Sequence, residues 1–258
     1  MDLKGLSDFH VHTTFSDGLN TPEEMVKSAI EKGMKSIGFS DHSYTFYDER
    51  YCMRKNEIDA YIETVNALKE KYAGKIEILC GIEQDMYSDC PTDRYDYVIG
   101  SVHYVNYGDE YPAVDASFKR ADGLTCVHAA AAKYENGDLY AIAEKYFETV
   151  SQVVEKTNCD IIGHFDLILK FSESYELFDE KSSRYRDAAA AAADKLLKTG
   201  RLFEINMGAM ARGIRTQPYP SDFLYNYIKK HGGKFILSSD AHEIKNLCFN
   251  FDKYKDRV

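Results

Sequence analysis

Histidine and carboxylate side chains recur in this 258-residue sequence just after short apolar segments. Six of the eight histidines occupy such positions, and three acidic residues accompany them. The set consists of His10, His12, Asp17, His42, Glu83, His103, His164, Asp240 and His242. Imidazole and carboxylate groups together suit Zn, Fe or Mn, and the sequence favours none of these three metals over the others. We expect the nine residues to form one metal centre.

A lone histidine near the end of a strand is more often a hydrogen-bonded structural residue than a ligand, and a His-X-His pair alone is a weak signal. The recurrence of histidines at the ends of several strands changes this interpretation, because burying many imidazoles and carboxylates together without partners costs free energy. Coordination to shared metal ions would offset that cost for the whole set. His128 and His231 lack this context, and we interpret both as structural or solvated. The motifs contain no cysteine, which argues against a structural zinc site.

The elements that must position these residues are short apolar segments alternating with amphipathic stretches, a pattern typical of βα units. Strands are expected at 6–9, 36–40, 76–81, 97–101, 161–163, 202–205 and 235–238. Helices are expected from a capping box at Thr21 to Gly33, from a cap at Asn56 to Gly74, and at 139–157, 184–199 and 222–231. This alternation predicts a parallel α/β barrel of seven units in one domain, residues 1–258. The C-terminal ends of the strands of such a barrel meet at one mouth, where active sites lie.

Charge and composition exclude several classes of protein. The 42 Asp and Glu residues outnumber the 32 Lys and Arg residues, and the net charge of −10 argues against a nucleic-acid or membrane-surface binder. No apolar run approaches the ~20 residues that cross a bilayer, and the first residues do not resemble a signal peptide. Six scattered cysteines indicate reduced thiols in a cytoplasmic protein. A small anionic substrate remains compatible with the charge, because bound metal ions can reverse its sign locally.

Six segments, in order over nearly the whole chain, resemble the polymerase-and-histidinol-phosphatase (PHP) family. They are HVHTTFSDG, GFSDH, GIEQD, IGSVHYV, GHFDLI and SSDAH. The resemblance implies a distorted (β/α)7 TIM-like barrel of the PHP type with three divalent transition-metal ions. By position, it implies three ligand sets, with Glu83 shared by the first two: His10, His12, Glu83 and Asp240; Glu83, His103 and His164; and Asp17, His42 and His242.

Within the family, the GSVH and GHFDL segments are especially similar to the monofunctional histidinol phosphatases. This similarity implies hydrolysis of L-histidinol phosphate in histidine biosynthesis, with Glu83, Asp17 and His242 as the catalytic residues. Three divalent ions would exceed the three carboxylate ligands by about three positive charges, which would attract a phosphate dianion. Metal ions also lower the pKa of a bound water towards ~7, so we expect direct attack by a metal-bound hydroxide without a phosphoenzyme.

Basic residues that would bind the phosphate are expected in two segments. EINMGAMARGIRTQPYPS follows the sixth strand and resembles a family loop that carries a phosphate-binding arginine. Arg212 is the first candidate and Arg215 the second, because arginine pairs with phosphate in a bidentate geometry. Lys170, shortly after HFDLI, is expected to replace a basic residue that relatives have at this point.

A long loop at 106–123, which carries Tyr and Asp residues, is expected to act as a lid. Tyr104 or Tyr107 would then line a pocket for an imidazole ring. The expected partner is thus a small phosphate ester, with no nucleic acid and no membrane.

Two other functions remain as alternatives. A phosphoesterase or phosphodiesterase of the same family, acting on another phosphate ester or a nucleotide, would share the metal ligands, but a nuclease would need an open basic groove. A non-catalytic regulatory module would typically have lost some of the ligands. The net charge argues against a nuclease, and the presence of all nine ligand positions argues against the regulatory module.

Overall fold

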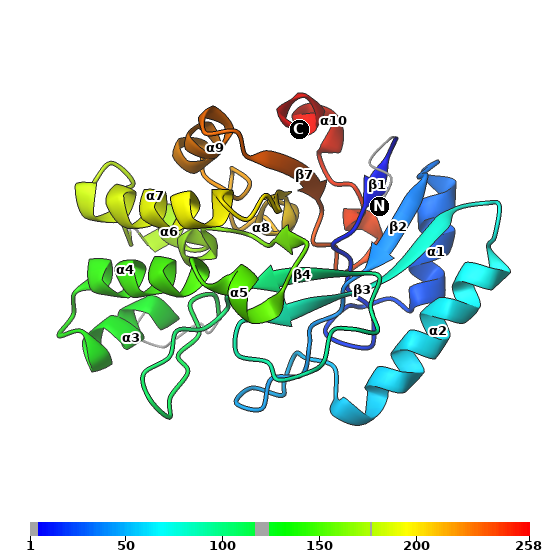
Figure 1. Ribbon diagram of the computed structural model, residues 1–258, viewed down its shortest axis with the longest axis horizontal. Coiled ribbons are helices and arrows are strands. Elements are labelled where there is room, and N and C mark those ends of the chain that lie inside the picture. Colours follow the sequence, from blue (N-terminus) through cyan, green and yellow to red (C-terminus); the bar gives the residue numbers. More distant parts are fainter. Residues whose placement is uncertain (1–4, 117–123, 176) are drawn as a thin grey trace.

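The computed structural model describes residues 5–116, 124–175 and 177–258 of the chain. Within these ranges, seven parallel strands form one sheet in chain order: β1 (Ser7–Asp8), β2 (Ser36–Phe39), β3 (Glu77–Asp85), β4 (Tyr97–Ser101), β5 (Ile161–Ile162), β6 (Leu202–Asn206) and β7 (Lys234–Ser238). The amide of His12 donates to the carbonyl of Ala241 at 2.9 Å, and the amide of Ala241 donates to the carbonyl of His10 at 3.1 Å. These bonds join the segments after β1 and β7, so the sheet nearly closes (Figure 1). The predicted seven-unit α/β barrel is confirmed.

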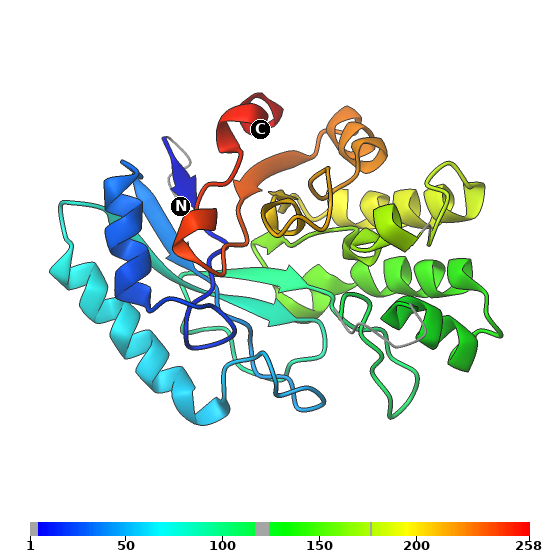
Figure 2. The same cartoon turned by 180° about the vertical axis from the view of Figure 1, so that it is seen from behind.

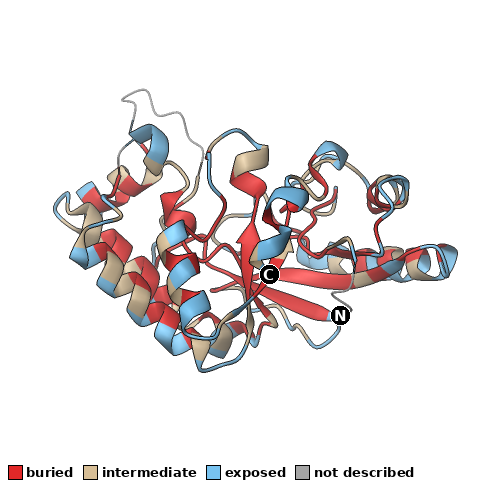
Figure 3. Cartoon of the chain, turned by 90° about the horizontal axis from the view of Figure 1, so that it is seen from above, coloured by how far each residue is buried: buried red, intermediate tan, exposed pale blue. Residues whose placement is uncertain are grey.

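Helices connect the strands and cover the outside of the sheet. They are α1 (Pro22–Glu31), α2 (Ile58–Lys71), α3 (Cys126–Tyr134), α4 (Leu139–Val150), α5 (Val153–Thr157), α6 (Ser172–Tyr175), α7 (Ser183–Leu197), α8 (Gly208–Ala211), α9 (Asp222–Lys230) and α10 (Phe251–Tyr254), with 3-10 turns at Lys55–Glu57, Leu167–Leu169, Ile244–Asn246 and Lys255–Arg257. Both Figure 1 and the reverse view in Figure 2 show α1 beside α2 at one end and α4 beside α7 at the other. The strands are buried, whereas the helices expose their outer faces (Figure 3). No helix in the described ranges is long and apolar enough to cross a membrane.

Helix α1 begins as the sequence predicts. The backbone amide of Glu24 donates to the Thr21 hydroxyl at 3.3 Å, and the Glu24 carboxylate accepts from the Thr21 amide at 2.8 Å. Pro22 occupies the first helical position, where its missing amide hydrogen costs nothing. This capping box fixes where the loop that carries Asp17 turns into the helix.

Two predicted helices have other boundaries than expected. Asn56 does not cap α2, because it lies inside the 3-10 turn Lys55–Glu57, and Glu57 is the residue that precedes the helix. The helix predicted at 139–157 is interrupted at residues 151–152, which separate α4 from α5. Local sequence did not reveal the interruption, because both halves keep apolar residues on the side that packs against the barrel.

Strand β3 is longer than predicted, and this changes the setting of one site residue. Residues 81–85 pair in register with Tyr97–Ser101 of β4, which extends the strand to Asp85. Glu83 therefore lies inside a strand rather than after it. Alternation along β3 directs Leu79, Gly81 and Glu83 to the barrel interior, since alternate residues share one face of a strand.

The lower part of the barrel interior is filled by a small cluster that is separate from the core beneath the helices. We call it the lower layer, and it consists of Phe9, Tyr97, Ile99, Ile161 and Ile236. The Tyr97 hydroxyl oxygen lies 2.6 Å from the carbonyl oxygen of Phe9 and 3.0 Å from that of Phe39, and can donate its hydrogen to either. A Cβ at Gly81 would clash with the Tyr97 ring, and one at Gly38 would clash with its hydroxyl oxygen. Glycine at these two positions therefore makes room for the tyrosine.

Candidate metal centre

Five imidazoles surround the carboxylate of Glu83 at the mouth of the barrel. The nitrogen–oxygen distances run from 2.8 Å to 3.5 Å, and the residues are His10, His12, His42, His103 and His164. Both oxygens take part: Oε2 lies 2.8 Å from His42 Nδ1, and Oε1 lies 2.9 Å from His164 Nε2. Glu83 thus stands between two groups of histidines, as a residue shared by two sites must.

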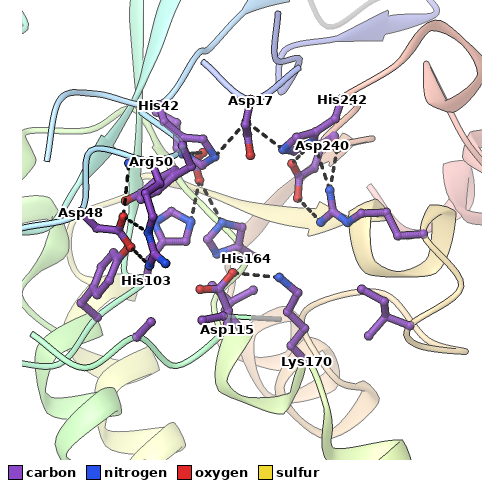
Figure 4. A pocket seen from close by; sticks show the side chains of 18 residues that line it. Asp17, His42, Asp48, Arg50, His103, Asp115, His164, Lys170, Asp240 and His242 are labelled. Atoms are coloured by element: carbon purple, nitrogen blue, oxygen red, sulfur yellow. Dashed lines mark hydrogen bonds and ion pairs between the residues drawn. The ribbon is translucent and has the colours of Figure 1, made fainter. Parts of the chain in front are cut away.

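The other two predicted carboxylates lie on one side of this cluster. Asp240 Oδ1 is 3.3 Å from His12 Nε2 and 3.5 Å from His242 Nδ1. Asp17 Oδ1 is 3.3 Å from His242 Nε2 and 3.7 Å from His42 Nε2. The structure therefore brings all nine predicted ligand residues together from six segments of the chain, as Figure 4 shows for six of them.

The described residues contain three groups whose nitrogen and oxygen atoms lie within 4.8 Å of one another. The groups are His12, Asp17, His42 and His242; His10, His12 and Glu83; and His42, Glu83 and His103. The first contains the whole third set implied by the family resemblance. The third differs from the implied second set in having His42 where the resemblance places His164.

Several atoms of this cluster that could bind a metal are buried without a hydrogen bond. The buried atoms without a hydrogen-bond partner include His10 Nε2 and both ring nitrogens of His12. Each such atom costs about 1–3 kcal/mol when it stays unsatisfied in a protein interior. A divalent transition metal would use these atoms as ligands, so the residues present fit such an ion.

In the metal-free cluster, charge and burial favour the ligating protonation state at Glu83 and His12. Burial alone would raise the pKa of Glu83, but His42, His10 and His103 hold it well below its ordinary value. Burial, together with His242 and His42, lowers the pKa of His12 to about 3. Glu83 is therefore a carboxylate and His12 a neutral imidazole, and these are the forms that bind metal ions. Neighbouring carboxylates instead raise the pKa of His10, His42 and His103 despite burial, so these imidazoles must each lose a proton when they bind a metal ion.

Two further carboxylates, which sequence reasoning missed, orient the histidines from behind. Glu204 Oε1 lies 2.5 Å from His10 Nδ1, and Asp85 Oδ2 lies 3.3 Å from His103 Nδ1. A carboxylate at one ring nitrogen fixes the tautomer and directs the other nitrogen towards a metal. Strand alternation was the available signal, since Asp85 lies two residues after Glu83 on the same face of β3.

A pocket of about 410 Å³ opens above the cluster, and two of the predicted phosphate-binding residues line it. The Arg212 guanidinium lies 3.2 Å from Asp240 Oδ2. Lys170 Nζ lies 2.9 Å from Asp115 Oδ2 (Figure 4). Tyr104 also lines the pocket.

The other two predicted substrate-binding residues do not line this pocket. Arg215 is buried elsewhere, and its guanidinium donates to the carbonyl of Leu169 at 2.5 Å. The Tyr107 hydroxyl donates to Glu135 at 2.6 Å, and the Tyr107 ring stacks on Tyr134.

The segment predicted as a lid is described only in part. Residues 104–113 fold back on themselves, with antiparallel bridges from Tyr104 to Ala113 and from Tyr107 to Glu110. Ala113, Asp115 and Ala116 reach the pocket wall. Residues 117–123 lie outside the described ranges.

His128 and His231 lie away from the cluster. His128 takes part in the capping box of α3 with Thr125. His231 follows the last turn of α9, where its ring packs on Tyr227 and its Nδ1 lies 2.8 Å from the Tyr227 carbonyl. Both positions agree with the structural interpretation.

The chain resembles known proteins in sequence and in fold. It is 27% identical to the histidinol-phosphatase of Lactococcus lactis over 272 residues, which cover 97% of this chain and 89% of the relative. A crystal structure of a protein described as a histidinol phosphatase from Listeria monocytogenes has a TM-score of 0.79, with 20% identity over 96% of this chain and 99% of the other. The crystal structure of Lactococcus lactis histidinol phosphate phosphatase, complexed with Zn, L-histidinol and phosphate, has a TM-score of 0.70, with 22% identity over 99% and 94%.

A family model supplies the classification. The PHP domain matches residues 8–208, which include seven of the nine predicted ligands. The remaining two, Asp240 and His242, follow β7, the strand that completes the sheet. This match over most of the chain, together with the seven-stranded barrel and the histidine–carboxylate mouth, shows that the chain belongs to the PHP family.

Proposed function

We propose that this protein is a metal-dependent phosphomonoesterase that hydrolyses L-histidinol phosphate to L-histidinol and phosphate. The observation that carries the proposal is the gathering of nine histidine and carboxylate residues at the mouth of the barrel, several of whose buried atoms lack a hydrogen-bond partner, beneath a pocket lined by Lys170 and Arg212. The Lactococcus lactis relative, which was crystallised with Zn, L-histidinol and phosphate, supports this choice of substrate.

Three divalent ions of Zn, Fe or Mn are proposed, held by the ligand sets that the family resemblance implies. The short distances from Glu83 to His10 and His164 support its sharing between two of them. The closeness of Asp17, His42 and His242 supports the third set. When bound, such ions would acidify a water molecule and neutralise charge on the phosphate oxygens.

The protein's own residues would orient the metal ligands and exchange protons with solvent. Glu204 and Asp85 hold His10 and His103 in fixed tautomers from behind. Glu83, Asp17 and His242 are the proposed catalytic residues. The Asp17 side chain is 34% exposed, whereas that of Glu83 is fully buried, so Asp17 and its partner His242 lie where protons can be exchanged with solvent.

Arg212 and Lys170 would bind the phosphate group. Both cations line the pocket beside the metal ligands, and each is held by a carboxylate in this structure. Charge-assisted bonds from such side chains to phosphate oxygens are short and strong. Tyr104, on the pocket wall, would pack against the imidazole ring of the substrate.

We further propose that residues 1–258 form one domain, because β7 and the ligands that follow it lie beyond the matched residues and complete the barrel. All six cysteines are free thiols, which favours action in the cytoplasm. The proposed partner is a small phosphate ester.

The direct test is phosphate release by the purified protein supplied with Mn or Zn. Three substrates are compared: L-histidinol phosphate, p-nitrophenyl phosphate and a cyclic dinucleotide. We expect kcat/KM to be highest for L-histidinol phosphate, and activity to disappear on chelation and to return with metal. Equal rates on the two monoesters, or a preference for the cyclic dinucleotide, would overturn the proposed substrate.

A further inference from the structure

Asp115 and Lys170 form an ion pair in the pocket and belong to neither the metal ligands nor the carboxylates behind them. Asp115 lies in the segment after β4, and Lys170 follows the 3-10 turn Leu167–Leu169 after β5. Lys170 Nζ lies 2.9 Å from Asp115 Oδ2, and both side chains are largely buried. Figure 4 shows this pair on the pocket wall, near His103 and His164.

The Asp115 carboxylate has one hydrogen-bonded cation among the described residues, Lys170. Within the described ranges, its only side-chain hydrogen bond is the one that Oδ2 accepts from Lys170. Burial alone would raise the pKa of Asp115, but Lys170 and then His103 keep it below its ordinary value. Asp115 is therefore a charged group, and it would lose its hydrogen-bonded cation if Lys170 moved away.

Another carboxylate of the same pocket, Asp48, is held much more firmly. Its oxygens accept from Arg50 Nε at 2.8 Å and from Arg50 Nη2 at 2.6 Å, and the Tyr104 hydroxyl donates to it at 3.0 Å. A ligand would have to displace several bonds to reach Asp48. Asp115 needs to exchange only one partner.

The charges of the pair match those of the proposed substrate. An amino-alcohol phosphate carries an ammonium group and a phosphate dianion, so it can supply one partner to each member of the pair. A buried ion that loses its partner is strongly destabilised, so the two exchanges must occur together. A phosphate ester without an amine would satisfy Lys170 and leave Asp115 unpaired.

We propose that Asp115 is a specificity-determining residue that binds the substrate's ammonium group, while Lys170 turns from Asp115 to the phosphate. This inference rests on the proposed function and names the part of the substrate that the pocket selects. The resident ion pair neutralises the pocket wall before binding. The same ion pair disfavours esters that lack the amine. Such an ester would draw Lys170 away and leave the Asp115 charge without its partner, and an unpaired charge of this kind lowers the affinity for the wrong ligand.

The test compares two substrates that differ only in the amine: L-histidinol phosphate and 3-(imidazol-4-yl)propyl phosphate. We expect wild-type protein to prefer the first, and Asp115→Asn to reduce the ratio of the two kcat/KM values by about ten- to a hundredfold, the usual loss with one charge-assisted hydrogen bond. Asp115→Glu keeps the charge and should restore part of the preference. Asp48→Asn is the matched control, and it should leave the ratio unchanged.

Binding of the product alcohol provides a readout without turnover. In calorimetric titrations of the metal-loaded protein, Asp115→Asn should weaken binding of L-histidinol and leave binding of 3-(imidazol-4-yl)propanol as it is in the wild type. Metal content and the circular dichroism spectrum of each variant establish that the site is intact.

The outcomes separate the two proposals. If the wild type hydrolyses L-histidinol phosphate with preference and Asp115→Asn keeps the full ratio, the role of Asp115 is overturned and the proposed function stands. A variant that loses both substrates equally also overturns it, because the effect is then structural. If the wild type shows no preference for L-histidinol phosphate over other monoesters, the proposed function fails and this inference fails with it.

Discussion

The two ends of the barrel interior are built from the same strands and behave in opposite ways. Strand β4 contributes Tyr97 and Ile99 to the lower layer, and the segment just after it contributes His103 to the mouth. The lower layer is apolar, and its one hydroxyl lies within hydrogen-bond distance of two backbone carbonyls. The mouth collects imidazoles and carboxylates, several of whose buried atoms lack partners.

This contrast separates what stabilises the barrel from what performs its chemistry. The lower layer is complete without any ligand, since its packing and hydrogen bonds are satisfied within the chain. The mouth has unsatisfied donor atoms at high density, and metal ions would satisfy them. Substitutions in the lower layer should therefore reduce stability, whereas substitutions in the mouth should reduce metal binding and turnover.

The largest effect is expected from Glu83→Gln. The change removes the negative charge on which five imidazoles converge, and kcat/KM should fall by more than about a hundredfold, because residues that only orient ligands already cost up to that much. Phosphate-release kinetics and elemental analysis measure the loss. The melting temperature of the metal-free variant should stay close to that of the metal-free wild type. Near wild-type turnover would show that Glu83 is peripheral.

Tyr97→Ala tests the opposite end. Truncating this fully packed ring leaves a cavity in the lower layer, and the free energy of unfolding should fall by about 3–5 kcal/mol. Denaturant titration measures the change, and metal content per folded chain should stay at the wild-type level. Tyr97→Phe keeps the ring and loses only the hydroxyl, so a loss of roughly 1–3 kcal/mol is expected. If Tyr97→Ala lost metal without losing stability, the division of roles between the lower layer and the mouth would be contradicted.

Glu204→Gln tests the boundary between the lower layer and the mouth. This residue is buried, yet its carboxylate contacts a proposed metal ligand. We expect metal affinity to fall about 10- to 100-fold, since His10 would lose the carboxylate that fixes its tautomer. Competition with a chromophoric chelator measures the affinity. Glu135→Gln, at a carboxylate that binds Tyr107 outside the pocket, is the control and should not change it.

Arg212→Ala and Arg215→Ala should differ in kind. Arg212 lines the pocket, so its loss should lower kcat/KM about ten- to a hundredfold on every phosphomonoester, all of which present the same dianion. Arg215 donates to backbone carbonyls in the interior, so its loss should lower the melting temperature more than the activity. Equal kinetic losses in the two variants would contradict this difference.

The smallest effect concerns two tyrosines near the pocket. Tyr104→Ala should reduce the preference for L-histidinol phosphate over p-nitrophenyl phosphate by about two- to tenfold, the amount that one aromatic contact contributes. Tyr107→Ala should change the preference less, because Tyr107 stacks on Tyr134 and does not line the pocket. The measurement is the ratio of the kcat/KM values for the two substrates. A larger change from Tyr107→Ala than from Tyr104→Ala would favour the hypothesis that Tyr107 lines the imidazole pocket.

Local sequence patterns predicted the elements best where one strong signal governs each. The bounds of β4 are as predicted, and the Thr21 capping box begins α1. The cap at Asn56 was wrong, because a 3-10 turn precedes α2, and the end of β3 was missed, because pairing with β4 extends it. Helix caps depend on neighbouring residues, whereas the length of a strand depends on a partner that is distant in the sequence.

For the site, the sequence by itself determined the nine histidine and carboxylate residues and the end of the barrel at which they would meet. Parallel strands have their carboxyl ends on one side, so order and residue type were sufficient. The tertiary structure alone decided that Glu204 and Asp85 support the histidines, that Asp115 pairs with Lys170, and that Arg212 rather than Arg215 faces the pocket. These contacts join strands and loops far apart in the chain, and the direction of a side chain there depends on packing that no local pattern records.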